Sequence, residues 1–208
     1  NGLQFAIKHA LDRVLALILL ILLSPVIAGA ALAVRLSSPG PILFRQRRVG
    51  RDGKVFDFYK FRSMRPAPEG EQPEQGSSAT DFLLPGDTAP GGVEGDDRRT
   101  AVGRFLRSTS LDELPQFFNV LRGDMSLVGP RPERPEFVEL FRQDVIRYGD
   151  RHRVKSGITG WAQVHGLRGQ TSLAERVEWD NYYIAHWSLG LDLRILALTL
   201  LALFRNAE

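Results

Sequence analysis

The stretch Ser108-Thr109-Ser110-Leu111-Asp112-Glu113-Leu114-Pro115-Gln116 places two adjacent carboxylates beside a possible helix start. Ser110 and Glu113 have the spacing of a capping box, which predicts that Asp112 lies in the first turn of a helix. The helix dipole and the free N–H groups favour negative charge there, so we expect Asp112 to be ionised at neutral pH. Pro115 removes one intrahelical bond and favours a slightly later helix start.

Arginines flank this acidic pair, with Arg104 and Arg107 upstream and Arg131 downstream in Gly129-Pro130-Arg131-Pro132. The two prolines limit where the Arg131 guanidinium can point, and arginine forks match phosphate oxygens. A carboxylate beside arginines suits attack on a phosphoryl centre or the binding of a divalent metal. Two plainer interpretations fit the same local pattern: a capped surface helix, and a rigid turn whose arginine is merely exposed.

Composition limits the remaining possibilities. The 208 residues suffice for one compact domain, alone or with a membrane element, and the absence of cysteine excludes disulfides and thiolate metal sites. Charge is unevenly distributed, since residues 66–99 hold eight acidic and two basic residues and residues 1–65 hold three acidic and eleven basic ones. The basic part indicates an anionic partner. Lipid headgroups or nucleotides fit better than nucleic acid, because no nucleic-acid-binding motif is present.

Val14–Val34 is a run of 21 uncharged residues bounded by Arg13 and Arg35, long enough for a membrane span. Ser24-Pro25 lies at its centre, where proline breaks or kinks a helix. Basic residues flank both ends, which the positive-inside rule places on the same, cytoplasmic, side. We therefore expect residues 1–36 to form a helix–break–helix that enters one leaflet and returns. A kinked spanning helix is the alternative.

The remaining pattern predicts a β-hairpin followed by helices. Two strands over 42–49 and 55–64 meet around Asp52-Gly53, and Lys60 and Arg62 near the second strand's end have the position of solvated strand-edge charges. Residues 66–99 are expected to form a long surface loop. We expect helices over 101–107, 111–121, 135–148, 172–187 and 189–204, and a short extended segment over 158–164 that contains Trp161.

Two features near the C-terminus bear on membranes and metals. The apolar segment 189–204 is short for a span and is expected to lie in the membrane interface or to pack on the N-terminal element. Aromatic residues just before it fit an interfacial belt or a protein core: Trp179, Tyr182, Tyr183 and Trp187. His152 and His165 stand alone, without the second ligand that a zinc site would need, and are expected to be structural or exposed.

Taken in order, the motifs of nearly the whole chain closely resemble the monotopic phosphoglycosyl transferases, the bacterial sugar transferase family. The resemblance is carried by the Ser24-Pro25 break, Pro39-Gly40-Pro41, Lys60-Phe61-Arg62-Ser63-Met64, Asp96-x-Arg98-x-Thr100-x-x-Gly103, Arg107, Ser110-Leu111-Asp112-Glu113-Leu114-Pro115-Gln116, and residues 119–132 and 155–164. Any one of these motifs is weak, but the ordered series is specific, and it favours a functional role for the acidic pair and for Arg131 over the plainer interpretations.

The resemblance implies an enzyme that moves a sugar-1-phosphate from a UDP-sugar to undecaprenyl phosphate and releases UMP. By matching position, Asp112 is the nucleophile that forms a covalent phosphosugar intermediate, and Glu113 is its partner. The resemblance also implies Mg²⁺ at Asp112 and Glu113. Its expected phosphate-binding residues are Arg107, Arg131, Lys60 and Arg62. Two departures from the family pattern, Ser156 for proline and His165 for asparagine, bear on the choice of sugar and not on the reaction.

The resemblance further implies a monotopic protein on the cytoplasmic face of the bacterial inner membrane, with membrane lipids as partners and a homodimer allowed. The expected fold class is α+β and mostly helical. It comprises a re-entrant membrane helix–break–helix over 1–36 and a cytoplasmic catalytic domain over 37–208, with a small β-hairpin, a helical catalytic core and a C-terminal interfacial helix. A glycosyltransferase that moves the sugar without phosphate and a non-catalytic lipid-binding scaffold are the alternatives.

Overall fold

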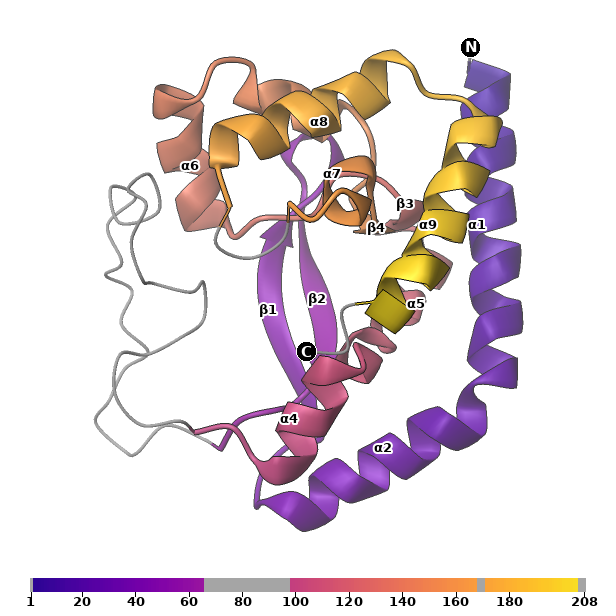
Figure 1. The fold of residues 1–208 in the computed structure, drawn as a ribbon, viewed down its shortest axis with the longest axis vertical. Coiled ribbons are helices and arrows are strands. Elements are labelled where there is room, and N and C mark those ends of the chain that lie inside the picture. The colour runs from indigo at the N-terminus through magenta and orange to yellow at the C-terminus, as the bar shows by residue number, and fades with distance from the viewer. Residues whose placement is uncertain (1, 66–97, 168–170, 206–208) are drawn as a thin grey trace.

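The computed structural model describes residues 2–65, 98–167 and 171–205, which are mostly helical (Figure 1). In chain order the elements are α1 (Gly2–Leu22), α2 (Ser24–Ser37), β1 (Leu43–Val49), η1 (Arg51–Gly53), β2 (Val55–Phe61), α4 (Ala101–Ser108), η2 (Leu111–Glu113), α5 (Gln116–Arg122), β3 (Ser126–Val128), α6 (Pro135–Asp144), η3 (Tyr148–Arg153), β4 (Gly157–Thr159), α7 (Trp161–Val164), α8 (Leu173–Ala185) and α9 (Leu189–Arg205). The expected mostly helical α+β class is confirmed. Nothing tests the expected division into residues 1–36 and 37–208, which stays a prediction.

The N-terminal helices α1 and α2 form the expected bent pair, with a 65° change of direction at Leu23. Pro25 lies in the first turn of α2, where its missing N–H costs no helical bond. Neither helix alone is long and apolar enough to cross a bilayer, but the bent pair together has the length and composition of a broken span or a re-entrant loop. The outer face of α1 exposes a stripe of large apolar residues: Leu3, Ile7, Leu11, Val14, Ile18 and Ile21.

The predicted hairpin is confirmed. Strands β1 and β2 pair antiparallel, with Leu43 opposite Phe61 and Val49 opposite Val55, and η1 makes the turn. A second sheet, parallel and two-stranded, joins β3 to β4 and was not predicted. The extended segment expected over 158–164 ends early, because Trp161 begins the short helix α7.

The acidic stretch differs from its prediction. Residues 111–113 form the 3-10 helix η2, and α5 begins only at Gln116, after Pro115. The predicted capping box is wrong, since Ser110 has a left-handed conformation (φ 57°) and its side chain caps nothing. Its backbone N–H donates to Arg107 O instead and closes the end of α4. The later start suggested by Pro115 is confirmed.

The C-terminal half follows the predicted helices with shifted ends. Helix α6 ends at Asp144, short of the expected residue 148, and α8 begins as predicted because Ser172 Oγ accepts the Glu175 N–H. The main core cluster brings α1, β2, α5, β3, α8 and α9 together, and its largest fully buried members include Tyr183, Met125 and Ile195. The surface loop expected over 66–99 falls, apart from residues 98 and 99, outside the described residues.

Candidate active site

Lys60, at the end of β2, lies between the two carboxylates of η2. Its ammonium is 2.6 Å from Glu113 Oε1 and 3.7 Å from Asp112 Oδ2. Arg131 donates to the same Glu113 oxygen at 2.8 Å. We call these four residues the acid cluster. Glu113 is therefore held by two cations, whereas Asp112 is buried but is approached only by Lys60 at salt-bridge range among the described residues.

The packing of α5 and α4 on β2 fixes the place of Lys60. Asn119, fully buried on α5, accepts the Tyr59 N–H and donates its amide to Asp57 O at 2.6 Å, so it acts as an extra strand partner for β2. On the other side, α4 approaches the chain after β2 so closely that a Cβ on Gly103 would collide with Ser63 O. Both contacts bring η2, which follows α4 and precedes α5, up to Lys60.

The backbone around Arg131 is held by arginine side chains from two other elements, η3 and β1. Arg151 donates to Arg131 O at 3.1 Å, and its guanidinium is paired with Asp180 of α8 at 2.8 Å in a nearly solvent-free contact (side chains 2% and 3% exposed). Arg48 of β1 donates to Pro132 O at 3.1 Å. Burial lowers the pKa of Arg48 to about 10, which still leaves it charged at neutral pH. These contacts and the two prolines limit the conformations of Arg131.

The two neighbouring carboxyl groups have opposite pKa shifts. Burial raises the pKa of Asp112, and the negative charge of Glu113 adds to this, while Lys60 partly offsets both. Burial also acts on Glu113, but Arg131 and Lys60 together outweigh it and hold the pKa of Glu113 far below its usual range. The expected reason for an ionised Asp112, a helix N-terminus, is therefore wrong, because no α-helix begins there. Lys60 is the nearest cation that stabilises its charged form.

The other two predicted phosphate-binding residues, Arg107 and Arg62, form no ion pair with the acidic pair. Arg107, in the last turn of α4, is exposed and lowers the pKa of Asp112 only through its charge. Arg62 is buried and faces the end of α2, where it donates to Pro39 O at 2.8 Å and to Ser38 O at 2.7 Å. Its guanidinium thus satisfies carbonyls that follow a helix end and fixes the junction of α2 to the hairpin. This geometry does not support the phosphate-binding role predicted for Arg62.

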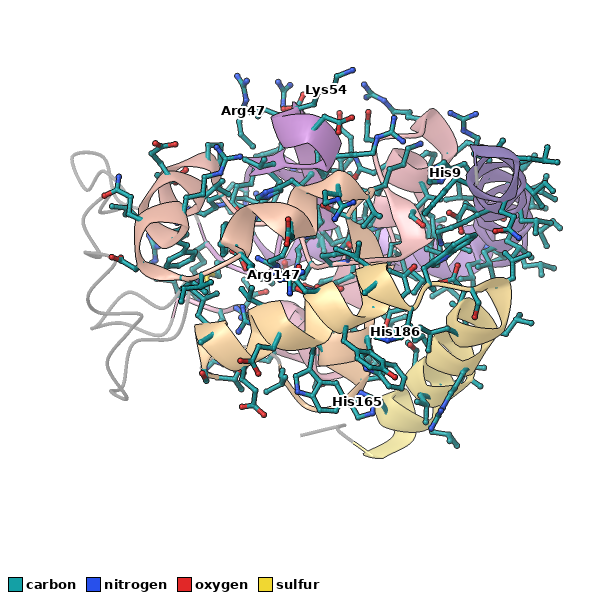
Figure 2. All side chains as sticks on the ribbon, turned by 90° about the horizontal axis from the view of Figure 1, so that it is seen from above. His9, Arg47, Lys54, Arg147, His165 and His186 are labelled. Carbon is teal, nitrogen blue, oxygen red and sulfur yellow. The ribbon has the colours of Figure 1, made fainter. Side chains whose placement is uncertain are left out.

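Several positioning residues were not identified from sequence: Arg48, Asn119, Arg151 and Asp180. Arg151 belongs to a basic run (151–155) that suggests a solvated surface, and only the fold shows that it is buried. The histidines behave as expected. His152 is buried, with its pKa lowered to about 4 by burial and the charge of Arg151, and His165 packs against Trp161. In Figure 2 His9 lies far from His165 and His186.

A magnesium ion would find a partial set of ligands here. No group of three or more potential metal ligands occurs among the described residues. However, Mg²⁺ is usually bound by one or two carboxylates together with substrate phosphates and waters. Asp112 and Glu113 supply two adjacent carboxylates, and Asp112 has no hydrogen-bond donor within the described part of the chain. The site therefore fits an ion that arrives with a diphosphate.

Comparison with known proteins shows the family to which the chain belongs. A bacterial sugar transferase profile matches residues 3–206. The chain belongs to the bacterial sugar transferase family. It is 47% identical over 210 residues to a UDP-glucose:undecaprenyl-phosphate glucose-1-phosphate transferase of Escherichia coli (strain K12), with 99% of this chain and 42% of the relative covered. The names of two further relatives, from other bacteria, specify different sugars.

A UDP-glucose:undecaprenyl-phosphate glucose-1-phosphate transferase of Xanthomonas campestris pv. campestris is 44% identical over 94% of this chain and 38% of the relative. A UDP-N-acetylgalactosamine-undecaprenyl-phosphate N-acetylgalactosaminephosphotransferase of Aeromonas hydrophila is 42% identical over 93% of this chain and 43% of the relative. The chain thus spans less than half the length of these three relatives. The acid cluster lies within the region that matches the family.

Proposed function

We propose that this chain transfers a sugar-1-phosphate from a UDP-sugar to undecaprenyl phosphate through a covalent intermediate on Asp112. The observation that carries the proposal is the unequal pair of carboxylates: Glu113 is neutralised by Lys60 and Arg131, whereas the Asp112 oxygens accept no hydrogen bond from the described residues. A nucleophile needs such an uncommitted oxygen, and its neighbours must stabilise the charge of the group it attacks. The names of the relatives support the two substrates.

In the first step an Asp112 oxygen attacks the phosphorus that carries the sugar. The new Asp112 O–P bond forms as the bond from that phosphorus to the bridging oxygen breaks, and UMP leaves with the bridging oxygen. In the second step an oxygen of undecaprenyl phosphate attacks the same phosphorus. The acyl phosphate bond then breaks, and Asp112 is regenerated as a carboxylate. Two steps at one site let a soluble donor and a lipid acceptor react in turn.

The remaining residues of the acid cluster would stabilise phosphate charge. Arg131 and Lys60 lie beside the carboxylates, where their donors could shift toward a bound diphosphate. Mg²⁺ held by Asp112 and Glu113 would neutralise charge on the transferring and leaving phosphates. Arg107, exposed at the end of α4, can attract the diphosphate through its charge.

The bent helices α1 and α2 would place this site at the membrane surface. We propose that they form a re-entrant element on the cytoplasmic side, supported by the 65° bend, the apolar outer face of α1 and the flanking basic residues. Helix α4, whose end leads into η2, packs against α2, and Arg62 ties the end of α2 to β2. The acid cluster would then lie near the depth of lipid headgroups, where undecaprenyl phosphate carries its phosphate.

Incubation with a donor alone tests the proposal. The chain in membranes or detergent should release one UMP per active site and carry a phosphosugar on Asp112, detected by intact-mass and peptide mass spectrometry. UDP-glucose is the first donor to test, because two of the three relatives above act on it, followed by other UDP-sugars. UDP in place of UMP would indicate transfer of the sugar alone. Absence of any product or adduct with all donors would indicate a scaffold.

A further inference from the structure

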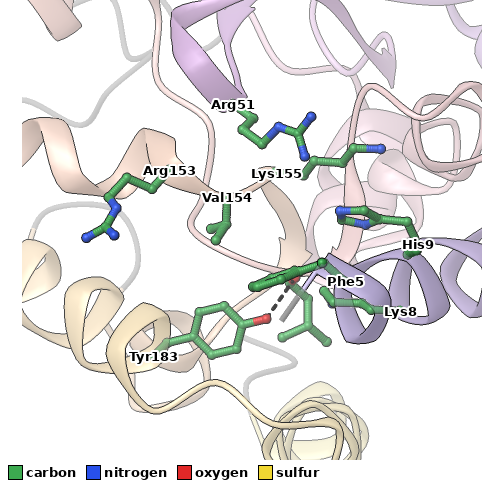
Figure 3. A pocket seen from close by; sticks show the side chains of 11 residues that line it. Phe5, Lys8, His9, Arg51, Arg153, Val154, Lys155 and Tyr183 are labelled. Atoms are coloured by element: carbon green, nitrogen blue, oxygen red, sulfur yellow. Dashed lines mark hydrogen bonds between the residues drawn. The ribbon is translucent and has the colours of Figure 1, made fainter.

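A second group of cations surrounds a cavity beside the first turns of α1. Its volume is about 340 Å³, within the range of small-molecule sites. Figure 3 shows that Arg51, Lys155 and His9 point toward one region above a floor made by Phe5 and Tyr183, whereas Arg153 points away at the rim. We call this cavity the basic pocket.

The basic pocket is separate from the acid cluster. Arg51 lies at the turn of the hairpin, and Lys60 lies near its open end, opposite Phe44. The five residue steps from Val55 to Lys60 span about 17 Å of strand. In the parallel sheet, Lys155 precedes β4 whereas Arg131 follows β3, so these two residues belong to opposite ends of that sheet.

Positive charge in the basic pocket is only partly balanced by the protein: Arg51 Nε lies 3.2 Å from the exposed carboxylate of Asp52, whereas Lys155 has no such partner among the described residues. Lys155 is partly buried, and within the described residues its ammonium has no hydrogen-bond or ion-pair partner. Burial lowers its pKa, and the charges of Arg13 and Arg51 lower it further. The nearby Asp12 already accepts a hydrogen bond from Ser126 and lies 3.6 Å from Lys8. An anion that enters the pocket would therefore gain attraction without displacing an existing pair of Lys155.

The walls of the basic pocket are partly apolar, so a ligand that fills it needs an apolar part. The Phe5 ring stacks on Trp187 at 4.3 Å between centroids, which fixes it as one wall, and Val154 lies opposite. The Tyr183 hydroxyl donates to Asp192 at 2.7 Å and is committed there. A ligand with a compact, multiply charged group and a short apolar or aromatic part matches both halves of the pocket.

We propose that the basic pocket binds a phosphate monoester, with its phosphate between Arg51 and Lys155 and its apolar part against Phe5. A dianionic phosphate offers three terminal oxygens to a guanidinium and an ammonium from different elements, whereas a carboxylate offers two oxygens and one charge. The ester could be a soluble metabolite or the headgroup of a lipid, and both share this chemistry.

Calorimetric titration with phenyl phosphate tests the site, with benzoate as the carboxylate counterpart. In the Arg131→Ala variant, which weakens phosphate binding at the acid cluster, phenyl phosphate should still bind, and more tightly than benzoate. Adding Lys155→Met or Arg51→Met should weaken that binding about tenfold, the loss of one charge-assisted contact. The control is Lys54→Met, which removes an exposed cation from the same turn, outside the pocket, and should change binding less than twofold.

Three results would overturn the proposal: no binding of phenyl phosphate once Arg131 is replaced, equal losses in Lys155→Met and Lys54→Met, or benzoate binding as tightly as phenyl phosphate. Circular dichroism of each variant excludes unfolding, and Arg51, half exposed at a turn, gives a variant that cannot disturb the core. Competition by vesicles of phosphatidylcholine with phosphatidic acid, against phosphatidylcholine alone, would identify a lipid source. Lack of competition would identify a soluble ester.

Discussion

Two regions of this molecule place one lysine between two carboxylates, and they differ in what else surrounds those charges. In the first region, which we call the α1 cluster, Lys8 lies between Asp12 and Asp192. In the acid cluster, Lys60 lies between Asp112 and Glu113. The α1 cluster joins helix α1 to α9 across a sequence separation of 184 residues. The acid cluster joins β2 to η2. The same three charges thus occur in a structural and in a candidate catalytic setting.

Solvent access and hydrogen bonding separate the two clusters. In the α1 cluster the side chains are 5–9% exposed. The two carboxylates also accept hydrogen bonds from Ser126, Tyr183 and Trp187. In the acid cluster the Lys60 and Glu113 side chains are about 20% exposed and Asp112 is 10% exposed, and the extra donor, Arg131, reaches only Glu113. Complete pairing holds two helices together, whereas incomplete pairing leaves Asp112 available for a ligand.

The largest expected difference concerns matched aspartate-to-asparagine changes. Asp112→Asn should reduce phosphosugar transfer about 10⁴-fold or more, because it removes the proposed nucleophile, and should leave the melting temperature unchanged or higher, since the folded protein disfavours ionised Asp112. Asp12→Asn should do the reverse, lowering the melting temperature while turnover per folded molecule is kept. Transfer rates and thermal unfolding of both variants decide this. Substantial transfer by Asp112→Asn would remove the nucleophile role.

Replacing the two lysines by methionine gives the next largest contrast. Lys8→Met leaves two carboxylates buried without their cation and should destabilise the fold by about 3–5 kcal/mol. Lys60→Met retains Arg131 on Glu113, and the buried Asp112, whose pKa is already raised, can take up a proton. The stability loss of this variant should therefore be about 1 kcal/mol or less, with transfer strongly reduced. Denaturant unfolding of both variants measures the difference. Equal losses of stability would mean that the two clusters do not differ as described.

Acid pH should stop the chemistry before it unfolds the protein. Because the folded-state pKa of Asp112 is raised, the nucleophile becomes protonated at a pH above the ordinary value of 3.8, and donor-only UMP release should fall about tenfold per unit below that point. Glu113 has a lowered folded-state pKa, so its contribution to stability is complete above its ordinary value of 4.5 and is lost only well below it. The rate of the donor-only UMP burst and circular dichroism across the same pH range test this. Coincident loss of both signals would contradict it.

The features that the sequence predicted correctly depend on interactions between residues close together in the chain. The Ser24-Pro25 break, the hairpin at Asp52-Gly53 and the cap at Ser172 depend on residues close together in the chain, and the structure confirms each. Ser110 shows the limit even there. Its spacing to Glu113 is that of a capping box, but closing α4 forces it into a left-handed conformation.

Long-range charge pairing was not predictable from sequence. Lys8 has the appearance of a cation that flanks an apolar run, and only the packing of α9 on α1 gives it Asp192 as a partner. Arg62 shares a motif with Lys60, but it follows the strand end and meets α2 in place of the acidic pair. The parallel pairing of β3 with β4 depends on segments about thirty residues apart and has no local signal. In each case the missing information is which distant element packs there.

The smallest expected effect is that of Tyr183→Phe, which tests whether the carboxylates of the α1 cluster have more hydrogen-bond donors than they need. Tyr183→Phe removes a hydroxyl that donates to Asp192 at 2.7 Å and lies 3.3 Å from Val128 O. Asp192 keeps two other donors, since Lys8 and Trp187 remain on it. The loss should therefore be that of one net hydrogen bond, about 1 kcal/mol, with transfer unchanged. Denaturant unfolding and donor turnover measure both quantities. A loss near that of Lys8→Met would instead show that the hydroxyl is essential to the charge balance of the cluster, and that its pairing is no more complete than that of the acid cluster.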